Sequence, residues 1–331
     1  MTMDLVHDAV AAIAAGRPVV VADDPSRENE GDLIFAAAHA TPKLVAFTVR
    51  HTSGFVCVAL PGEDCDRLAL PPMHHRDDDP FGTAYRVTVD LRGTGTGISA
   101  TDRARTIAAL ASPGSTPHDF TRPGHVVPLM ARDGGVLSRP GHTEAAVDLP
   151  RLAGLPAAGA LCEIVSQERP GHMARGAELA RFAAEHDLVH LSIADLVAFR
   201  QRTEPQVRRA AATSLPTSYG RFEAIGYEGR YDSAQHIALL AGPIGDDVPV
   251  YVHTECLTGD IMRSAACRCG RDLDDAMKRF TAQGHGVIIY LRPSGLPRAC
   301  ALFGDTTGTD GIAQWILDDL GVQPAPRLIA V

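Results

Sequence analysis

The sequence predicts an α+β protein of two domains: a larger one with a mixed sheet and helices, then a smaller α/β domain. Its 331 residues exceed the length of one ordinary domain, which is about 100–200 residues. Helical and strand segments alternate without a steady strand–helix–strand period, which argues against a doubly wound parallel sheet. A polar stretch containing Pro205 and Pro216 interrupts this pattern near the middle of the chain.

The first domain is expected over residues 1–200. Apolar residues at helical spacing predict a helix over 4–15, which Gly16 and Pro18 end. Three consecutive valines predict a buried strand at 19–21. The same two patterns predict further strands at 55–60, 87–90, 126–129 and 160–164, and helices at 173–186 and 193–199.

A linker is expected over residues 201–217, because the segment is polar and contains two prolines. The smaller domain follows over residues 218–331. Buried strands are predicted at 249–252 and 286–291, and an amphipathic helix at 311–320.

Composition excludes several classes of function. Lys and Arg number 31 against 40 Asp and Glu, a net charge of −9, whereas nucleic-acid-binding domains are usually basic. No apolar run approaches the ~20 residues of a membrane span, and the acidic N-terminus does not resemble a signal peptide. Seven cysteines in a long chain do not suggest a disulfide framework. We therefore expect a cytoplasmic protein that binds neither nucleic acid nor a membrane.

An acidic segment directly follows the first predicted strand. Residues 23–32 read Asp-Asp-Pro-Ser-Arg-Glu-Asn-Glu-Gly-Asp, with five carboxylates and one arginine. Carboxylates at a strand end can hold a hard cation such as Mg²⁺, which prefers oxygen ligands. The alternative interpretation is a solvated acidic loop, because runs of charge usually face water.

A second group of polar residues lies between 122 and 163. The triplet Pro-Gly-His occurs twice, at 123–125 and 140–142, and histidine serves as a base or a ligand near neutral pH. Arg139 and Thr143 flank the second triplet and could hold a phosphate by charge and hydroxyl. Glu163 lies in an apolar strand, where a carboxylate suits general acid or base catalysis. The alternative for Glu163 is a structural ion pair with a neighbouring arginine.

These segments resemble the 3,4-dihydroxy-2-butanone 4-phosphate synthase family of riboflavin biosynthesis. The match runs in order over about residues 4–200. Besides the acidic segment it includes Ser-Gly-Phe-Val-Cys at 53–57, Gly-Thr-Ala at 82–84, Thr-Gly-Ile-Ser-Ala at 96–100, Arg-Pro-Gly-His at 122–125, Gly-His-Thr-Glu-Ala at 141–145, Cys-Glu-Ile at 162–164 and Met-Ala-Arg at 173–175.

The resemblance implies conversion of D-ribulose 5-phosphate to dihydroxybutanone phosphate and formate, with Mg²⁺ or Mn²⁺. By position, Glu28 and His142 would hold the metal, and His125 and Glu163 would be the catalytic acid and base. The substrate would be bound by Arg27, Glu28, Asp32, Cys57, Arg139, Pro140, Gly141, His142, Thr143 and Glu163. A homodimer with the active site near the subunit interface is also implied.

Three cysteines of the second domain suggest a metal site. Cys256, Cys267 and Cys269 could bind Zn²⁺ and leave the fourth tetrahedral position to water; an accidental cluster is the alternative. The domain resembles GTP cyclohydrolase II, in which such cysteines hold a catalytic zinc. The matching motifs are Leu-Pro-Thr at 215–217, Gly-Arg-Phe at 220–222, His236, Cys-Leu-Thr-Gly-Asp at 256–260 and Tyr-Leu-Arg at 290–292.

The second domain departs from that family at several functional positions. Tyr251 stands where the family has an arginine that helps bind GTP, and Asp272 replaces a glutamine. After residue 292 the family's Glu-Gly-Arg-Gly-Ile-Gly run is absent, and so is a segment of about 25–30 residues that, by the resemblance, would carry the catalytic aspartate and arginine. We expect a truncated, inactive domain, because a zinc-bound water alone cannot place the triphosphate. The alternatives are a bifunctional enzyme and a regulatory or docking module.

Overall fold

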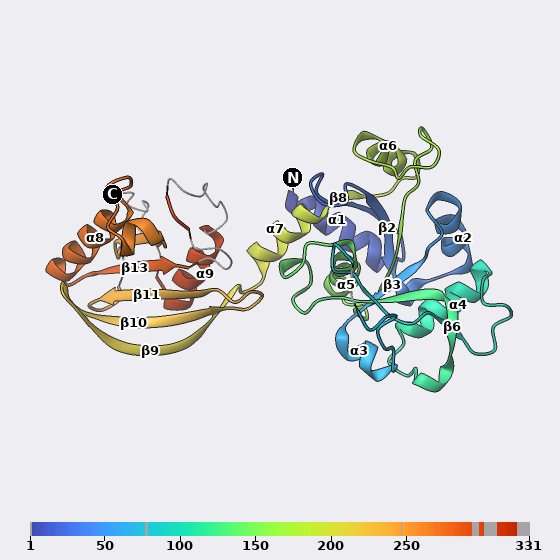
Figure 1. Ribbon diagram of the computed structural model, residues 1–331, viewed down its shortest axis with the longest axis horizontal. Helices are drawn as coiled ribbons and strands as arrows, with labels where there is room; N and C mark the ends of the chain where they lie inside the picture. The colour runs from blue at the N-terminus through green and yellow to red at the C-terminus, as the bar shows by residue number, and fades with distance from the viewer. Residues whose placement is uncertain (1, 77–78, 246, 293–297, 301–309, 323–331) are drawn as a thin grey trace. The chain divides into compact units, whose positions relative to one another are not determined.

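The computed structural model describes residues 2–76, 79–245, 247–292, 298–300 and 310–322. The chain forms two compact units, Met1–Arg200 and Gln201–Val331 (Figure 1). Each unit has its own sheet and its own hydrophobic core.

Unit 1 contains a mixed sheet, as the sequence predicts. Its strands follow the order β4-β6-β3-β7-β2-β1-β8, and β5 pairs with β6. The β1–β8 and β3–β6 pairs are parallel, and the other pairs are antiparallel. The strands are β1 (Val19–Ala22), β2 (Gly31–Ala36), β3 (Cys57–Leu60), β4 (Ala84–Tyr85), β5 (Val89–Leu91), β6 (Phe120–Met130), β7 (Gly159–Glu163) and β8 (His190–Ser192).

Helices cover both faces of this sheet (Figure 1). On one face α1 (Thr2–Ala14), α5 (His142–Leu152) and α7 (Ile193–Thr203) pack on Ile34 and its neighbours. On the other face α2 (Pro42–His51), α3 (Gly62–Arg67) and α4 (Ala100–Leu110) pack on Phe35 and its neighbours. Side chains alternate between the two faces along a strand, so consecutive residues of β2 supply two different cores. A further helix, α6 (Ala177–Glu185), buries Leu179 and Phe182 against Leu33.

Unit 2 is a five-stranded sheet in the order β12-β13-β11-β10-β9. Only β12 and β13 pair in parallel among its described strands. The strands are β9 (Val207–Thr217), β10 (Gly220–Gly229), β11 (Gln235–Ala241), β12 (Val250–Thr254) and β13 (Gly286–Leu291). One core includes residues of α8 (Cys269–Gln283) and another includes residues of α9 (Asp310–Leu320), which places the two helices on opposite faces.

The expected linker is wrong over most of its length. Residues 207–217 form β9, which pairs with β10 from Thr217 opposite Gly220 to Val207 opposite Gly229. The strand escaped prediction because nine consecutive side chains are exposed, so no alternation of apolar and polar residues marks it. Pro216 fits because β9 is an edge strand, where a missing N–H costs no ladder hydrogen bond.

The other predicted elements differ mainly at their ends. The helix expected from 173 begins at Ala177, because residues 165 and 173 form a β-bridge instead. Strand β6 begins at Phe120, six residues before the predicted start. No helix in the described part of the chain is long and apolar enough to cross a membrane.

Candidate active site

The predicted substrate residues meet at a cavity of about 110 Å³ in unit 1. Alternate residues of a strand lie on the same face of a sheet. Asp32, Cys57 and Leu161 therefore lie on the face of Ile34 and Ala59, which α5 covers. The lining consists of Arg27, Glu28, Glu30, Asp32, Cys57, Thr83, Tyr85, Leu129, Arg139, His142, Thr143, Leu161 and Glu163. Eight of the ten residues predicted to bind substrate are therefore at this cavity; Pro140 and Gly141 are in the loop beside it.

The acidic segment is folded around the carboxylate of Asp23. That carboxylate accepts hydrogen bonds from the backbone N–H of Glu28 at 3.0 Å and of Glu30 at 2.9 Å, and it pairs with Arg27 at 3.1 Å. Asn29 adopts a left-handed backbone conformation with φ of 55°, which asparagine tolerates better than most residues. This tight turn brings the side chain of Glu28 to the cavity, so the segment is more than a solvated acidic loop.

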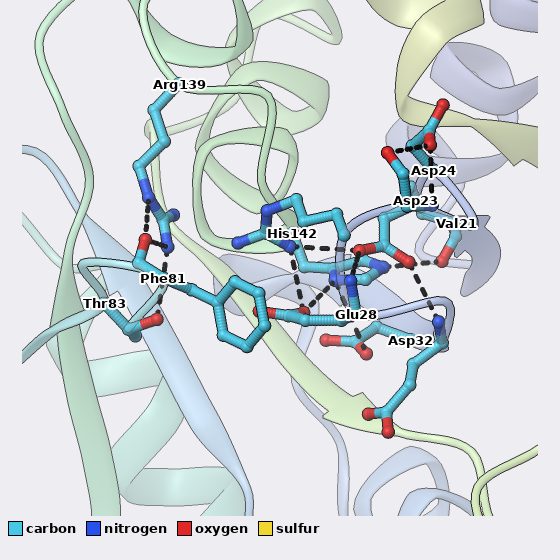
Figure 2. A network of polar contacts seen from close by, with 12 residues as sticks. Val21, Asp23, Asp24, Glu28, Asp32, Phe81, Thr83, Arg139 and His142 are labelled. Atoms are coloured by element: carbon cyan, nitrogen blue, oxygen red, sulfur yellow. Dashed lines mark hydrogen bonds and ion pairs between the residues drawn. The ribbon is translucent and has the colours of Figure 1, made fainter. Parts of the chain in front are cut away.

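His142 begins α5 and faces the acidic segment (Figure 2). Its Nδ1 lies 3.3 Å from a carboxylate oxygen of Glu28 and 4.0 Å from one of Asp32. Its Nε2 lies 3.2 Å from the carbonyl oxygen of Val21. Because a carbonyl only accepts, Nε2 carries a proton and donates it there, which leaves Nδ1 as the ligand atom in the neutral ring. Ligand atoms of Asp23, Glu28 and His142 all lie within 4.8 Å of one another.

The electrostatics of this cluster suit a cation. Four carboxylates line the cavity against two arginines. Burial raises the pKa of Asp32 to about 7, and its Oδ1 has no hydrogen-bond partner among the described residues. Burial works against protonation of His142, but the charge of Asp32 and the hydrogen bond with Glu28 raise the pKa of His142 to about 9. A divalent ion would satisfy the unpartnered oxygen and the excess negative charge, so the residues present fit Mg²⁺ or Mn²⁺.

Arg139 is held in place by several acceptors. Its guanidinium donates to the carbonyl oxygen of Phe81, to the hydroxyl of Thr83 and to the carboxylate of Glu144 (Figure 2 shows the first two). A Cβ on Gly141 would lie 2.5 Å from the guanidinium and 2.9 Å from that carboxylate. A side chain at this position would therefore displace the guanidinium and the carboxylate from their present ion pair. Thr143 lies in the first turn of α5, whose free backbone N–H groups favour an anion.

Glu163 ends β7 at the cavity and is half-buried rather than fully buried. The hydroxyl of Ser53 donates to its carboxylate at 2.7 Å, which fixes the orientation of that carboxylate. No described arginine forms an ion pair with Glu163, contrary to the structural alternative.

Burial raises the pKa of the nearby Cys57 thiol, so this residue forms a neutral wall of the cavity and not a nucleophile.

His125 stands apart from this group. It is not among the described residues that line the cavity, and its side chain is 43 % exposed. Its Nδ1 lies 2.6 Å from the carboxylate of Asp90, which also accepts the His125 backbone N–H at 2.9 Å. The structure of one chain thus does not bring the expected acid–base pair, His125 and Glu163, to one cavity.

Sequence reasoning missed several residues of the site. Thr83, Tyr85 and Glu30 line the cavity, and Glu144 and Asp90 orient the predicted residues. The Gly-Thr-Ala motif at 82–84 was a usable signal for Thr83. No local pattern marks Asp90, because it lies 35 positions from His125.

The predicted zinc cysteines come together in unit 2, and Cys300 joins them. Ligand atoms of Cys256, Cys267, Cys269 and Cys300 all lie within 4.8 Å of one another. Among the residues expected to mark the loss of GTP binding, Tyr251 is buried with its hydroxyl 3.1 Å from His253, and Asp272 pairs with Arg268. The replaced run at 293–297 lies outside the described residues.

The cavity is small and contains four carboxylates, one imidazole and two arginines. This set of groups is typical of an enzyme that performs acid–base chemistry on a small polar substrate. Residues 7–199 match the family model for 3,4-dihydroxy-2-butanone 4-phosphate synthase, a family of riboflavin biosynthesis, and the chain belongs to that family. Residues 208–300 match the model for GTP cyclohydrolase II.

Known proteins resemble the chain over most of its length. It is 59% identical to riboflavin biosynthesis protein RibBA of Salinispora tropica over 294 residues, which cover 88% of this chain and 73% of the relative. RibBA of Nocardia farcinica is 59% identical over 292 residues, which cover 87% and 70%.

Solved structures match both units or unit 1 alone. A two-domain 3,4-dihydroxy-2-butanone 4-phosphate synthase from A. baumannii, RibBX, has a TM-score of 0.77 at 35% identity and covers 98% of this chain and 94% of its own. A 3,4-dihydroxy-2-butanone 4-phosphate synthase in complex with two magnesium ions has a TM-score of 0.58 at 46% identity. That match covers 60% of this chain and 97% of the solved one.

Proposed function

We propose that unit 1 converts D-ribulose 5-phosphate to 3,4-dihydroxy-2-butanone 4-phosphate and formate with Mg²⁺ or Mn²⁺. The observation that carries the proposal is the shared cavity of Glu28, Asp32, His142 and Glu163 beside Arg139 and Thr143. The seven cysteines are all free, which supports a reducing compartment such as the cytoplasm.

The chemistry explains why these residue types are needed. Enolisation beside the carbonyl, loss of water, a carbon shift and release of formate each move protons. Glu28 and His142, with Asp32 and Asp23 beside them, would hold the metal, which would supply stabilisation of negative charge on the substrate oxygens. Glu163 exchanges protons with the substrate, and the Ser53 hydroxyl keeps its carboxylate oriented. Arg27, Arg139, Thr143 and the N-terminus of α5 hold the phosphate.

His125 completes the acid–base pair from a second chain in this proposal. Its side chain is exposed and lies 2.6 Å from the carboxylate of Asp90, and it is not among the described residues that line the cavity of its own chain. The family resemblance implies a homodimer with the active site near the interface, and that arrangement would let His125 of one subunit serve the cavity of the other. Mixing an inactive His125→Ala chain with an inactive Glu163→Gln chain tests this, since mixed dimers regain one intact site. Absence of any regained activity in verified mixed dimers contradicts shared sites.

The experiment that tests the function is formate release from D-ribulose 5-phosphate. The protein freed of divalent ions with a chelator should be inactive, and added Mg²⁺ should restore release of one formate per substrate. A pentose phosphate of different carbonyl position, ribose 5-phosphate, is the matched control and should release none. Inactivity of the Mg²⁺-loaded protein on ribulose 5-phosphate would refute the proposal.

For unit 2 we propose that it does not open the guanine ring of GTP. The support is the replacement of two family positions by Tyr251, which hydrogen-bonds to His253, and Asp272, which pairs with Arg268. The bifunctional alternative is favoured by the match of residues 208–300 to GTP cyclohydrolase II. Incubation with GTP and Zn²⁺ separates the two, because formation of the pyrimidine product contradicts the proposed inactivity. A docking module remains the third alternative and predicts binding of a protein partner without turnover of GTP.

A further inference from the structure

Unit 2 contains four of the seven cysteines, and all four lie in one cluster. The Sγ atoms of Cys256 and Cys267 are 3.9 Å apart, and those of Cys269 and Cys300 are 3.5 Å apart. Four thiolates at ~2.3 Å from a central zinc in tetrahedral geometry have sulfur atoms ~3.8 Å from one another. The separations therefore match a zinc site with four sulfur ligands, and they exceed the ~2.05 Å of a disulfide.

Cys300 is held at the cluster by the backbone around it. The backbone N–H of Leu257 donates to the carbonyl oxygen of Arg298 at 2.8 Å, which fastens the segment 298–300 to the loop that carries Cys256. Ala299 is buried, and the Cys300 N–H points to the Cys256 sulfur at 3.5 Å. Such N–H donors to sulfur are typical of thiolates that bind a metal, because they disperse the negative charge.

The rest of the cluster is packed tightly by two glycines. A Cβ on Gly259 would lie 2.9 Å from the Cys267 sulfur and 2.9 Å from the Cβ of Cys269. A Cβ on Gly270 would lie 2.2 Å from the carbonyl oxygen of Gly259. The backbone near Cys256 thus lies directly against the start of α8, which brings three separate chain segments to one point.

We propose that Cys300 is a fourth protein ligand that closes this zinc site. With three thiolates a tetrahedral zinc keeps a position for water, whereas four thiolates leave none. The metal would then tie together the loop after β12, the start of α8 and the segment after β13 as a structural centre. This inference rests on the proposal that unit 2 does not open the guanine ring of GTP. Spectroscopy of the bound metal tests the fourth ligand separately, because it measures no turnover of GTP.

The test replaces zinc by Co²⁺ in the full-length protein and records its absorption. The wild-type site should show charge-transfer intensity of four thiolates and should not change when azide is added, because no position is open. Cys300→Ser should lose about a quarter of that intensity and should respond to azide. Cys300→His supplies another ligand and should again be insensitive to azide, while Cys65→Ser, in the core of unit 1, should match the wild type.

Three results would overturn the proposal: a wild-type Co²⁺ site that already responds to azide, a wild-type protein that binds no zinc in unit 2, or a Cys269–Cys300 disulfide found by mass. The azide response of the wild-type protein needs no variant, so misfolding of Cys300→Ser cannot leave the question open. Formation of a pyrimidine product from GTP would refute the proposed function of unit 2 separately, because these spectra are read without GTP.

Discussion

The two units each assemble metal-ligand side chains, but they surround them differently. In unit 1, oxygen and nitrogen ligands line a cavity together with arginines, a threonine and the first turn of a helix. In unit 2, four sulfur atoms face one another, and glycines pack the backbone closely against them. One chain therefore offers two kinds of metal-ligand set: oxygen and nitrogen atoms beside a cavity with arginines, and sulfur atoms packed against backbone.

The largest loss of activity is expected from Glu163→Gln, which changes the cavity of unit 1 and leaves unit 2 untouched. Loss of the carboxylate that we propose to exchange protons with the substrate should lower kcat for formate release by about 10²–10⁴-fold. Circular dichroism should be unchanged, since glutamine can still accept the Ser53 hydrogen bond. Ser53→Ala, which frees the carboxylate and also removes the acceptor of the Phe55 backbone N–H, is the control and should cost about tenfold or less. Equal rates for Glu163→Gln and the wild type would contradict the assigned role.

The second expected effect is the pH dependence of Mg²⁺ binding to unit 1. The pKa of His142 is raised to about 9, so this residue is protonated at neutral pH without metal and must lose that proton to become a ligand. The apparent Kd for Mg²⁺ should therefore fall as pH rises from about 7 to 9, by at most about tenfold per unit, and level off above that. Calorimetry should also detect proton release on binding, and His142→Gln should remove this part of the slope. A Kd that rises with pH in this range would contradict the ligand role.

A smaller effect is expected from Arg139→Lys. Lysine cannot donate to the Phe81 carbonyl, Thr83 and Glu144 at once, as the planar guanidinium does. KM for the phosphate substrate should rise about tenfold, or ~1.4 kcal/mol, with a lesser change in kcat. Arg151→Lys is the matched control, because Arg151 is half-exposed and pairs with Asp148 rather than with the cavity. A selective loss of kcat would instead place Arg139 in the chemical step.

The smallest effect should follow removal of the metal from unit 2. Zinc is first removed with a thiol reagent and a chelator, and Mg²⁺ is then restored. Formate release should change by less than about twofold, because unit 1 has its own core and cavity. The same treatment should lower the thermal transition of unit 2, since a structural zinc stabilises the fold that holds it. Loss of formate release that only zinc restores would show that the two units are coupled.

The parts of the fold that follow from local patterns could be predicted from the sequence. The valines of β1 and the apolar run of β13 mark buried strands without help from their neighbours. By contrast, β9 is exposed on both faces and exists because of its pairing with β10, which no local pattern reveals.

The same limit applies to the two sites. The family resemblance pointed to Glu28, Asp32, His142 and Thr143 because each lies in a short contiguous motif, and these four residues line one cavity. No local spacing predicts Cys300 as a ligand, since it lies 31 positions beyond Cys269 and meets the other cysteines only in the folded chain. The separation of His125 from the cavity likewise depends on packing between distant strands, which motif spacing does not encode.

The measurement that most directly tests the contrast between the units is formate release by one preparation loaded with both Mg²⁺ and Zn²⁺. Each substrate, D-ribulose 5-phosphate or GTP, is offered separately, and formate is counted per chain. We expect sustained formate release from ribulose 5-phosphate and none from GTP above a protein-free control. Formate release from GTP at a comparable rate, or none from ribulose 5-phosphate, would contradict the proposed division of activity between the units.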